Sequence, residues 1–346
     1  MNTMPKPHWV TLLVGTCCLI QGCGSKPSAS SGVTSQPVGQ PRQVTSPPQL
    51  RDVRVRLDWT PWAPHAALFA AEDQGYFRDE GLRVKLYVPP DPEATIQLVA
   101  AGQDDFGISY MTDVIMAREQ GVKVVSLAAI VQHPLNCIMT LKSSGIDTPG
   151  KLKGATIGTT GEPSDQAFLN WVLENNGVNP HTVRLVNIGF NLAPALKSRK
   201  VDAIIGAYWP WEGIKLQEEG SPVNIMRLQD SGVPDYYELV LISRSDLLTK
   251  DPSLVQAFLR ALVKGQQFVD KNPEQAVQIL KRADPDLSEA FLRSSLQAIL
   301  PLMRTDSGDF RQDSKAWSDM VMFMQKADLL KNPPDVSTAF TNHYLP

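Results

Sequence analysis

The spacing of apolar residues changes repeatedly between two periods along the chain, and each change predicts a switch between strand and helix. From residue 51 to residue 131, short apolar and β-branched runs alternate with stretches of helical spacing. This order is typical of a mostly parallel sheet covered by helices. The predicted strands are 53–57, 83–88, 106–109 and 122–131, and the predicted helices are 65–80, 94–101 and 112–120.

A second series of the same kind follows a further predicted strand at 136–142, and the chain is helical from Pro252 onward. The strands at 136–142 and 238–242 are candidates for crossing from one series to the other. Two crossings predict a hinged clamp of two α/β lobes with a helical C-terminal tail, whereas independent domains in series would need one linker. The second series consists of strands 155–158, 183–188, 203–208 and 223–227 and helices 164–175, 192–198 and 211–219.

The N-terminus has the pattern of an export signal. Lys6 precedes an apolar run from Trp9 to Ile20. A run of about a dozen residues is too short to cross a bilayer as a helix but suits a signal-peptide core. Gly22 before Cys23 resembles a bacterial lipobox, which implies cleavage before Cys23 and lipidation of its thiol. A plain secretory signal and an uncleaved anchor are the alternatives.

The sequence predicts a division into signal, tether and two-lobed body. Residues 1–22 are the predicted signal peptide. Residues 23–50 are rich in Gly, Ser, Pro, Gln and Thr, so they bury too little surface to offset their ordering entropy, and we expect a disordered tether. The remaining chain is long enough for two lobes. Lobe one comprises 51–143 and 243–346, and lobe two comprises 144–242.

Composition excludes several classes of protein. The chain has 33 basic and 36 acidic residues, interspersed, for a net charge of −3, whereas nucleic-acid binding requires a basic face. Cys17 and Cys18 fall within the predicted signal and Cys23 is the predicted anchor, which leaves Cys137 alone. A single thiol forms no internal disulfide, and no second Cys is present to build a zinc or iron–sulfur cluster. No metal or other cofactor is expected.

The stretch from Leu57 to His65 is the first candidate ligand-binding element. A strand ends in Asp58, Trp59, Pro61, Trp62 and Pro64 before an apolar helix begins, so a polar, aromatic loop lies at a strand's carboxyl end. Ligands of α/β proteins bind at such ends, which makes Asp58, Trp59, Trp62 and His65 candidates. The alternative is an ordinary connection whose Trp residues fill the core.

The second candidate element is Tyr208-Trp209-Pro210-Trp211-Glu212, which follows an apolar strand of lobe two. Its rings could stack on a flat heterocycle, and a carboxylate can accept two parallel N–H bonds from an amidine-like edge such as that of an aminopyrimidine. Tyr208, Trp209, Trp211 and Glu212 are therefore candidates. The alternative is that Glu212 complements a helix N-terminus while the Trp residues fill the interlobe core.

Other polar residues occupy strand ends or the predicted crossings. Small residues precede a helix between 158 and 164, a setting suited to anion or carbonyl contacts, but the Gly-Lys-Ser/Thr ending of a nucleotide-binding loop is missing. A Ser or Asn at a strand end often caps a helix instead. Tyr236 and Tyr237 could either close the pocket wall or pack the hinge. The remaining candidates are Ser109, Tyr110, Thr112, Asn136, Thr159, Gly161, Ser164 and Tyr237.

Several of these motifs resemble a known superfamily. Leu57-Asp58-Trp59-Thr60-Pro61, Gly75-Tyr76-Phe77 and Phe106-Gly107-Ile108-Ser109-Tyr110 are similar to motifs of SsuA-like and thiamine-pyrimidine-precursor solute-binding proteins, most closely the ThiY-like branch. The resemblance implies a type II periplasmic binding-protein fold and an acid at Glu212. It further implies a monomeric, lipid-anchored subunit of an ABC importer, in the periplasm or at the outer face of the plasma membrane, with a permease and an ATPase as partners. The implied ligand is a thiamine-pyrimidine precursor such as a formylaminopyrimidine.

The superfamily also includes thiamine-pyrimidine synthases, which resemble the clamp but hold pyridoxal phosphate on a Lys and consume a His. Ser109 and Asp113 stand here where those residues would be, and without an amine there is no Schiff base. The chain also lacks Gly-x-Ser-x-Gly and His-Glu-x-x-His motifs. The sequence therefore predicts a binding protein and not an enzyme.

Three other functions remain open at this stage. A riboflavin-type binder would use the same aromatic residues in a wider cleft. A sulfonate or nitrate binder would need cationic or N–H-rich groups, whereas the candidates are acidic and aromatic. A sensory or scaffolding protein without an importer would leave no trace in the sequence.

Overall fold

The computed structural model describes residues 49–88, 94–304 and 309–346, which belong to one compact unit. The predicted signal peptide, all but the end of the predicted tether, and the predicted lipidation at Cys23 lie outside these residues. None of the described helices is both long and apolar enough to span a membrane.

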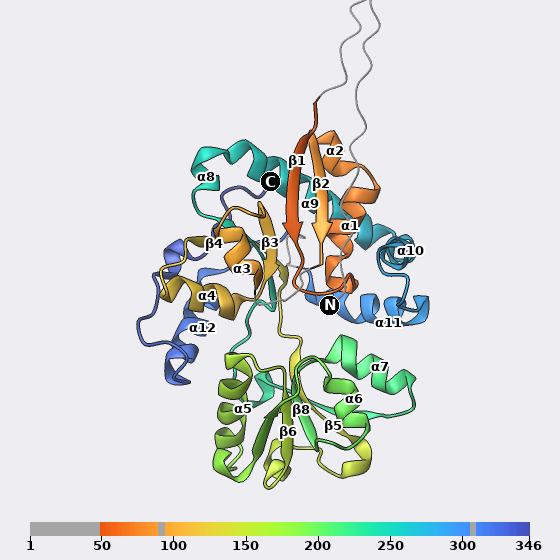
Figure 1. The fold of residues 1–346 in the computed structure, drawn as a ribbon, viewed down its shortest axis with the longest axis vertical. Helices are drawn as coiled ribbons and strands as arrows, with labels where there is room; N and C mark the ends of the chain where they lie inside the picture. Colours follow the sequence, from red (N-terminus) through yellow and green to blue (C-terminus); the bar gives the residue numbers. More distant parts are fainter. Residues whose placement is uncertain (1–48, 89–93, 305–308) are drawn as a thin grey trace, which may run out of the picture. The chain divides into compact units, whose positions relative to one another are not determined.

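The first of two five-stranded sheets contains four strands that run in one direction and one that runs against them. β1 pairs in parallel with β2 (Figure 1) and with β3, and β10 lies antiparallel between β3 and β4. The strand order is β2-β1-β3-β10-β4. The strands are β1 (Arg51–Arg56), β2 (Leu82–Tyr87), β3 (Phe106–Ser109), β4 (Val124–Val131) and β10 (Leu239–Arg244).

The second sheet repeats this plan. β6 pairs in parallel with β7 and β8, and β5 lies antiparallel between β8 and β9. The order β7-β6-β8-β5-β9 again puts the reversed strand next to the edge. The strands are β5 (Asn136–Leu141), β6 (Thr156–Thr159), β7 (Arg184–Asn187), β8 (Ala203–Tyr208) and β9 (Val223–Arg227). We call each sheet with its helices a lobe.

Each reversed strand directly follows a crossing of the chain between the lobes. β5 pairs within the second sheet and β10 within the first, so neither strand is shared between lobes. The crossings are the short segments before them, residues 132–135 and 234–238. Strand pairing therefore places the lobe boundaries at these segments and not near residues 143 and 243, as predicted. The apolar pattern of a strand does not reveal which sheet the strand joins.

Helices cover both sheets, and the C-terminal helices return to the first lobe. The predicted helix 65–80 is interrupted at Gly75, which has a φ of +77° and divides it into α1 and α2. The first lobe contains α1 (Ala66–Asp73), α2 (Tyr76–Asp79), α3 (Ala94–Ala100), α4 (Met111–Glu119), α8 (Leu247–Lys250), α9 (Pro252–Lys271), α10 (Pro273–Ala283), α11 (Glu289–Ile299) and α12 (Ser314–Lys326). The second contains α5 (Pro163–Asn175), α6 (Leu192–Lys197) and α7 (Ile214–Glu218).

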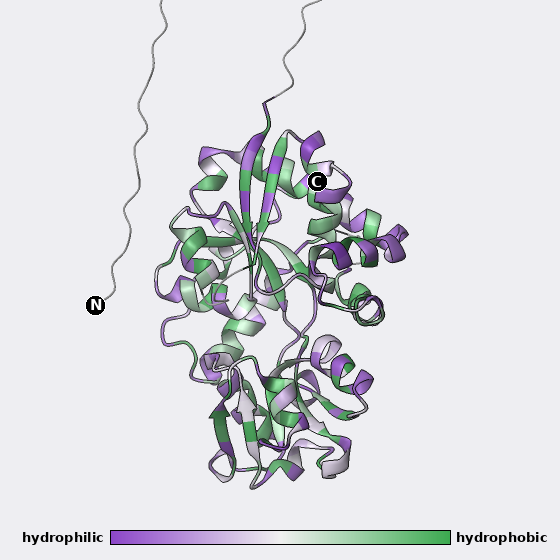
Figure 2. Cartoon of the chain, turned by 45° about the vertical axis from the view of Figure 1, so that its right-hand side comes forward, coloured by the Kyte–Doolittle hydropathy of each residue, from purple (hydrophilic) through white to green (hydrophobic). Residues whose placement is uncertain are grey.

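The longest helix, α9, shows how the amphipathic pattern becomes packing. Its apolar stripe is buried against α1 and the first sheet, where Phe258 stacks on Phe106 with ring centroids 4.2 Å apart. Burying such a side chain contributes about 1.5–3 kcal/mol. Gly265 lets α9 approach α1 closely, since a Cβ there would lie 2.1 Å from the carbonyl oxygen of Ala67. In Figure 2 several helices carry both hydrophobic and hydrophilic segments, as expected for helices with one buried and one exposed face.

Candidate ligand-binding site

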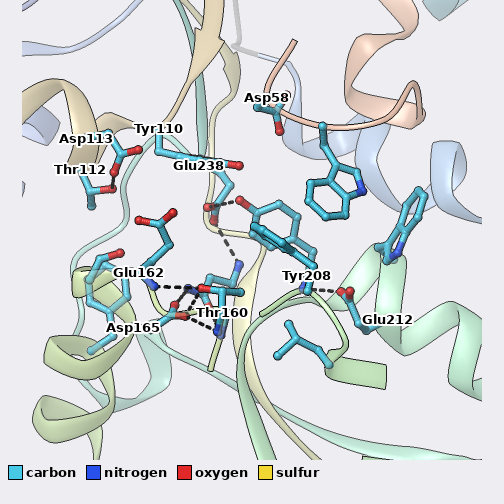
Figure 3. Close-up of a pocket in the computed structure, with 18 of the residues that line it drawn as sticks. Asp58, Tyr110, Thr112, Asp113, Thr160, Glu162, Asp165, Tyr208, Glu212 and Glu238 are labelled. Carbon is cyan, nitrogen blue, oxygen red and sulfur yellow. Dashed lines mark hydrogen bonds between the residues drawn. The ribbon is translucent and has the colours of Figure 1, made fainter. Parts of the chain in front are cut away.

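A cavity of about 870 Å³, including its opening to solvent, lies where the carboxyl ends of the parallel strands of both sheets face each other (Figure 3). Its residues follow β1, β3, β6, β7 and β8 or lie where the chain enters β5 and β10. Ligand sites of open α/β sheets occupy this position. The lining residues are Asp58, Trp59, Trp62, Tyr110, Thr112, Asp113, Asn136, Thr160, Glu162, Ser164, Asp165, Phe168, Phe190, Leu192, Gly206, Tyr208, Trp211, Glu212, Tyr236 and Glu238.

Every charged side chain that lines the cavity in the described part of the chain is an acid. No Lys, Arg or His is among the lining residues. A cavity of this charge favours a ligand that presents N–H donors or positive charge and disfavours an anion. The six acids are Asp58, Asp113, Glu162, Asp165, Glu212 and Glu238.

Glu212 is a cavity acid whose pKa is raised by burial. It lies in the single π-helical turn Trp209–Gly213 that follows β8, and its Oε2 accepts a hydrogen bond from the backbone N–H of Tyr208 at 2.8 Å. Burial raises the pKa of Glu212 to about 7, although the N–H of Tyr208 and the charge of Lys215 oppose the shift. Glu212 can therefore share a proton with a weakly basic ligand at neutral pH.

Glu238 connects the two crossings to each other. One oxygen accepts from the backbone N–H groups of Leu135 and Asn136, at 2.7 and 3.1 Å, and the other accepts from the hydroxyl of Tyr208 at 3.0 Å. Burial raises the pKa of Glu238, while these hydrogen bonds oppose the rise. The side chain thus joins both hinge segments to the end of β8.

Asp165 organises the loop after β6. Its Oδ2 accepts from the hydroxyls of Thr159 and Thr160, at 2.8 and 2.7 Å, and its Oδ1 accepts from the side-chain amide of Asn136 at 3.2 Å. Burial raises the pKa of Asp165 against these hydrogen bonds. Gly206 leaves room for this network, because a Cβ there would lie 2.5 Å from Asp165 Oδ2 and its φ is +82°.

Aromatic rings of the two lobes meet at the cavity. Trp62 stacks on Tyr208 with centroids 6.1 Å apart and meets the edge of Trp211 at 5.1 Å, while Trp59 contacts Phe190 at 4.3 Å. The sequence predicts a flat ligand between such rings. In this arrangement the rings contact each other, so a ligand between Trp62 and Tyr208 would first have to separate them.

The structure brings many of the predicted site residues to one cavity and keeps others out of it. Those that line it are Asp58, Trp59, Trp62, Tyr110, Thr112, Asn136, Ser164, Tyr208, Trp211 and Glu212. Those that do not are His65, Ser109, Thr159, Gly161, Trp209 and Tyr237.

Several of the residues outside the cavity support residues within it. His65 hydrogen-bonds to Asp58 through Nε2 at 2.7 Å, and Thr159 donates to Asp165. The backbone N–H of Gly161 donates to the hydroxyl of Thr159 at 3.2 Å. These residues hold the loops in place rather than facing the cavity.

The other residues outside the cavity pack within their own lobes. Ser109 pairs with Val240 in the first sheet. Trp209 packs into the second lobe's core, with the guanidinium of Arg227 4.2 Å from its ring. The hydroxyl of Tyr237 accepts from the backbone N–H of Asp313 at 2.6 Å, which corresponds to the hinge-packing alternative for this residue.

Sequence reasoning missed about half of the lining. Tyr236, which the sequence offered with Tyr237 as a possible pocket wall, does line the cavity. Glu162 and Asp165 flank the predicted Ser164, and Glu238 follows the predicted Tyr237, so proximity in sequence was a signal for these three. Phe190 reaches the cavity from a loop without any ligand-like pattern. The residues that were not predicted are Asp113, Thr160, Glu162, Asp165, Phe168, Phe190, Leu192, Gly206 and Glu238.

Within residues 49–88, 94–304 and 309–346, no group of three or more His, Cys, Asp or Glu is placed so that it could hold a metal ion.

Two α/β lobes joined by two crossings, with a cavity at the carboxyl ends of both sheets, are the architecture of a periplasmic binding protein. The alkanesulfonate-binding protein SsuA of Xanthomonas axonopodis pv. citri has this fold and superposes with a TM-score of 0.67 at 17% identity, over 85% of this chain and 99% of that one. The predicted fold class is thus confirmed.

The chain belongs to the NMT1/THI5-like family, which matches residues 62–276. It is 35% identical over 298 residues to the formylaminopyrimidine-binding protein of Halalkalibacterium halodurans, covering 85% of this chain and 90% of that protein. It is also 26% identical over 300 residues to the 4-amino-5-hydroxymethyl-2-methylpyrimidine phosphate synthase THI11 of Saccharomyces cerevisiae, covering 84% and 86%. The resemblance read from the motifs is confirmed.

The comparisons agree with the prediction of a binding protein. The 35% identical relative is named as a binding protein, whereas the yeast synthase is 26% identical. Ser109 and Asp113 are the local differences that the sequence indicated. Ser109 is buried in β3 and Asp113 lines the cavity.

Proposed function

We propose that this protein binds a small aminopyrimidine of the thiamine-precursor class, of the formylaminopyrimidine type. The observation that carries the proposal is the charge of the cavity, where six acids and no basic side chain line the described walls. An aminopyrimidine offers N–H donors and a weakly basic ring nitrogen, which match these acceptors. The 35% identical relative named for a formylaminopyrimidine supports the same ligand class.

In this proposal Glu212 pairs with the edge of the pyrimidine that carries the ring nitrogen and the exocyclic amine. Its pKa of about 7 allows one proton to be shared between the carboxyl group and the ring nitrogen at neutral pH. Trp62, Trp211 and Tyr208 offer ring faces against which the pyrimidine stacks once the lobes part to admit it. Closure about the crossings then buries the ligand.

We further propose that the protein is a lipid-anchored subunit of an ABC importer for thiamine salvage, working as a monomer in the periplasm or at the outer face of the plasma membrane. Gly22-Cys23 after an apolar segment supports the anchor, and the binding-protein fold supports the partnership with a permease and an ATPase. Mass spectrometry of the mature N-terminus tests the anchor, because a diacylglyceryl group on Cys23 is expected there and an unmodified Cys23 would contradict it.

A sulfonate ligand, as bound by the superposed SsuA protein, receives no support from the lining residues. A sulfonate carries a full negative charge and would be placed among carboxyl groups, with no Lys, Arg or His among the described lining residues. The likeness in fold at 17% identity does not carry the ligand with it.

Calorimetric titration tests the proposal directly. The purified protein is titrated with formylaminopyrimidine, 4-amino-5-hydroxymethyl-2-methylpyrimidine, thiamine, riboflavin and taurine. We expect a pyrimidine to bind with a sub-micromolar Kd, that is, more favourably than about −8 kcal/mol, and taurine not to bind. Binding of riboflavin or taurine without binding of a pyrimidine would contradict the assignment of this cavity.

A further inference from the structure

The carboxylate oxygens around the cavity differ in how well the protein itself satisfies them. Both oxygens of Glu238 and both of Asp165 accept hydrogen bonds from protein donors. Asp58 is different, because its Oδ1 is bonded to His65 but its buried Oδ2 has no hydrogen-bond partner in the described structure. A buried carboxylate oxygen without a donor is costly, so its presence in a cavity wall calls for an explanation.

The orientation of Asp58 is fixed by a short relay. The backbone N–H of Trp62 donates to Nδ1 of His65 at 3.3 Å, and Nε2 of His65 lies 2.7 Å from Asp58 Oδ1. Because Nδ1 accepts, the neutral ring carries its proton on Nε2, which donates to Asp58. Asp58, Trp62 and His65 are each at most 1% exposed, so the relay has little freedom to rearrange.

This relay leaves Oδ2 of Asp58, a residue that lines the cavity, without a hydrogen bond from the protein. Figure 3 shows Asp58 at the margin of the cavity, which it lines together with Trp62. The lobes meet at this point through Trp62 and Tyr208, which helps to exclude water from Oδ2. A ligand N–H group that reaches this oxygen would supply the missing donor.

We infer that Asp58 Oδ2 accepts a hydrogen bond from an N–H group of the ligand that does not pair with Glu212, and that His65 is the positioning residue for Asp58. The inference rests on the proposed function and deepens it. A formylaminopyrimidine has two such sources, the second hydrogen of its amino group and its formamide N–H. Either one gives the carboxylate the donor that the protein does not provide.

The same contact makes closure depend on the ligand. When the lobes meet, Asp58 Oδ2 loses access to water, which raises the free energy of the closed arrangement. A ligand N–H removes this cost in the closed arrangement and has a smaller effect in the open one, where water serves as donor. Such a difference between the two states is what a ligand needs to shift their populations.

The test compares Asp58→Asn with Asp104→Asn in the full-length protein. In Asp58→Asn the amide oxygen stays bonded to His65, so the new N–H₂ group would face the ligand's donor, and we expect affinity for formylaminopyrimidine to fall about 10- to 100-fold. Asp104 is an equally buried acid of the first lobe that is bonded to Arg56 and does not line the cavity. Asp104→Asn is expected to leave the affinity unchanged.

His65 is tested with two variants that differ in where they place an amide. His65→Gln puts an N–H₂ group near the Nε2 position and keeps the donor to Asp58, whereas His65→Asn reaches only the Nδ1 position and removes it. We expect His65→Gln to keep most of the affinity for formylaminopyrimidine. We expect His65→Asn to lose as much affinity as Asp58→Asn does. Equal affinities of the two variants would contradict the positioning role.

The choice of probe identifies the donor and separates this inference from the proposed function. If Asp58→Asn loses affinity only for formylaminopyrimidine, the donor is the formamide N–H. If it also loses affinity for 4-amino-5-hydroxymethyl-2-methylpyrimidine, the donor is the amino group. If the wild-type protein binds formylaminopyrimidine and Asp58→Asn binds it with an affinity within twofold of the wild type, only the inference is overturned. An equal loss of affinity in Asp104→Asn also overturns only the inference. Wild-type protein that binds no pyrimidine overturns the proposed function as well.

Discussion

At the scale of single residues, Glu212 combines a cost to the fold with a role in the proposed ligand contact. Burial raises its pKa from 4.5 to about 7, so the native state holds a proton that the unfolded chain releases between these values. Stability from this group therefore falls as the pH rises from about 4.5 to about 7, and the full cost of the buried charge applies above pH 7. The native protein retains this cost at a position that faces the cavity.

Replacing Glu212 by Gln should change stability and affinity in opposite directions. The amide oxygen can still accept from the N–H of Tyr208, and no charge is buried, so the variant should be more stable than the wild type at pH 8 by up to about 2 kcal/mol. The difference should be much smaller near pH 5 and should vanish below about pH 4. Affinity for formylaminopyrimidine should fall about 10- to 100-fold, because a donor replaces one acceptor.

Denaturant unfolding at both pH values and calorimetric titration measure the two effects of Glu212→Gln. An equal stability difference at pH 5 and pH 8 would argue against the raised pKa. Unchanged affinity would argue against edge pairing, whatever the stability shows.

At the scale of elements, the two crossings are joined on both sides of the hinge. Inside, Glu238 accepts from the backbone of residues 135 and 136. Outside, Nδ1 of His133 in the first crossing lies 2.8 Å from the carboxylate of Asp235 in the second. The hydrogen bond with Asp235 raises the pKa of His133, while partial desolvation opposes the rise.

The outer pair should make the hinge sensitive to pH. Because the folded pKa of His133 is raised, its contribution to stability is complete below about pH 6.5 and is lost as the pH rises through the folded value. Asp235→Asn should therefore lower the melting temperature at pH 6 and have little effect at pH 8.5. Both partners are partly exposed, so we expect a shift of about 1–3 °C.

NMR titration of the His133 ring checks the cause, since the ring pKa should fall in Asp235→Asn. Asp52→Asn serves as the control because Asp52 is an exposed acid of β1 paired with Arg83. A His133 pKa that does not respond to Asp235→Asn, or that responds equally to Asp52→Asn, would refute the hinge pair.

At the scale of the whole molecule, the lobes contact each other through aromatic rings as well as through the crossings. Trp211 of the second lobe meets Trp62 edge-on and also Phe291 of α11, with centroids 5.0 Å apart in the latter pair. The ammonium of Lys215 lies 4.2 Å from the Trp211 ring. The C-terminal helices thus take part in the contact between lobes.

Substitutions of two neighbouring tryptophans can distinguish the contact between lobes from packing within one lobe. Trp211 lines the cavity and bridges the lobes, whereas Trp209 packs within the second lobe. Trp211→Ala should weaken binding of formylaminopyrimidine at least about tenfold, because it removes ring contacts worth roughly 0.5–1.5 kcal/mol each together with apolar surface that the ligand and the lobes share.

Trp209→Ala should mainly lower the melting temperature and leave affinity within about threefold, since its ring packs against the second lobe's core and Arg227 and does not line the cavity. Calorimetric titration and thermal unfolding of both variants measure the contrast. If Trp209→Ala loses as much affinity as Trp211→Ala, the assignment of Trp211 to the contact between lobes is wrong.

The local pattern of the sequence was sufficient for the elements and for the edge of the sheets at which the site lies. Strand periodicity ends at Leu57, Ser109 and Tyr208, and polar or aromatic residues follow directly, so Asp58, Tyr110 and Glu212 could be assigned to loops at strand ends. These assignments depend on chain neighbours alone, and chain neighbours are fully visible in a sequence.

Only the tertiary structure decided which of these side chains share a cavity and which serve as support. Whether β5 and β10 pair with one sheet or the other, whether Trp209 or Trp211 faces the cavity, and that Glu238 joins both crossings depend on contacts between residues far apart in the chain. The direction of a side chain in a π-helical turn or a proline-containing loop follows no period, so packing against the opposite lobe determines it.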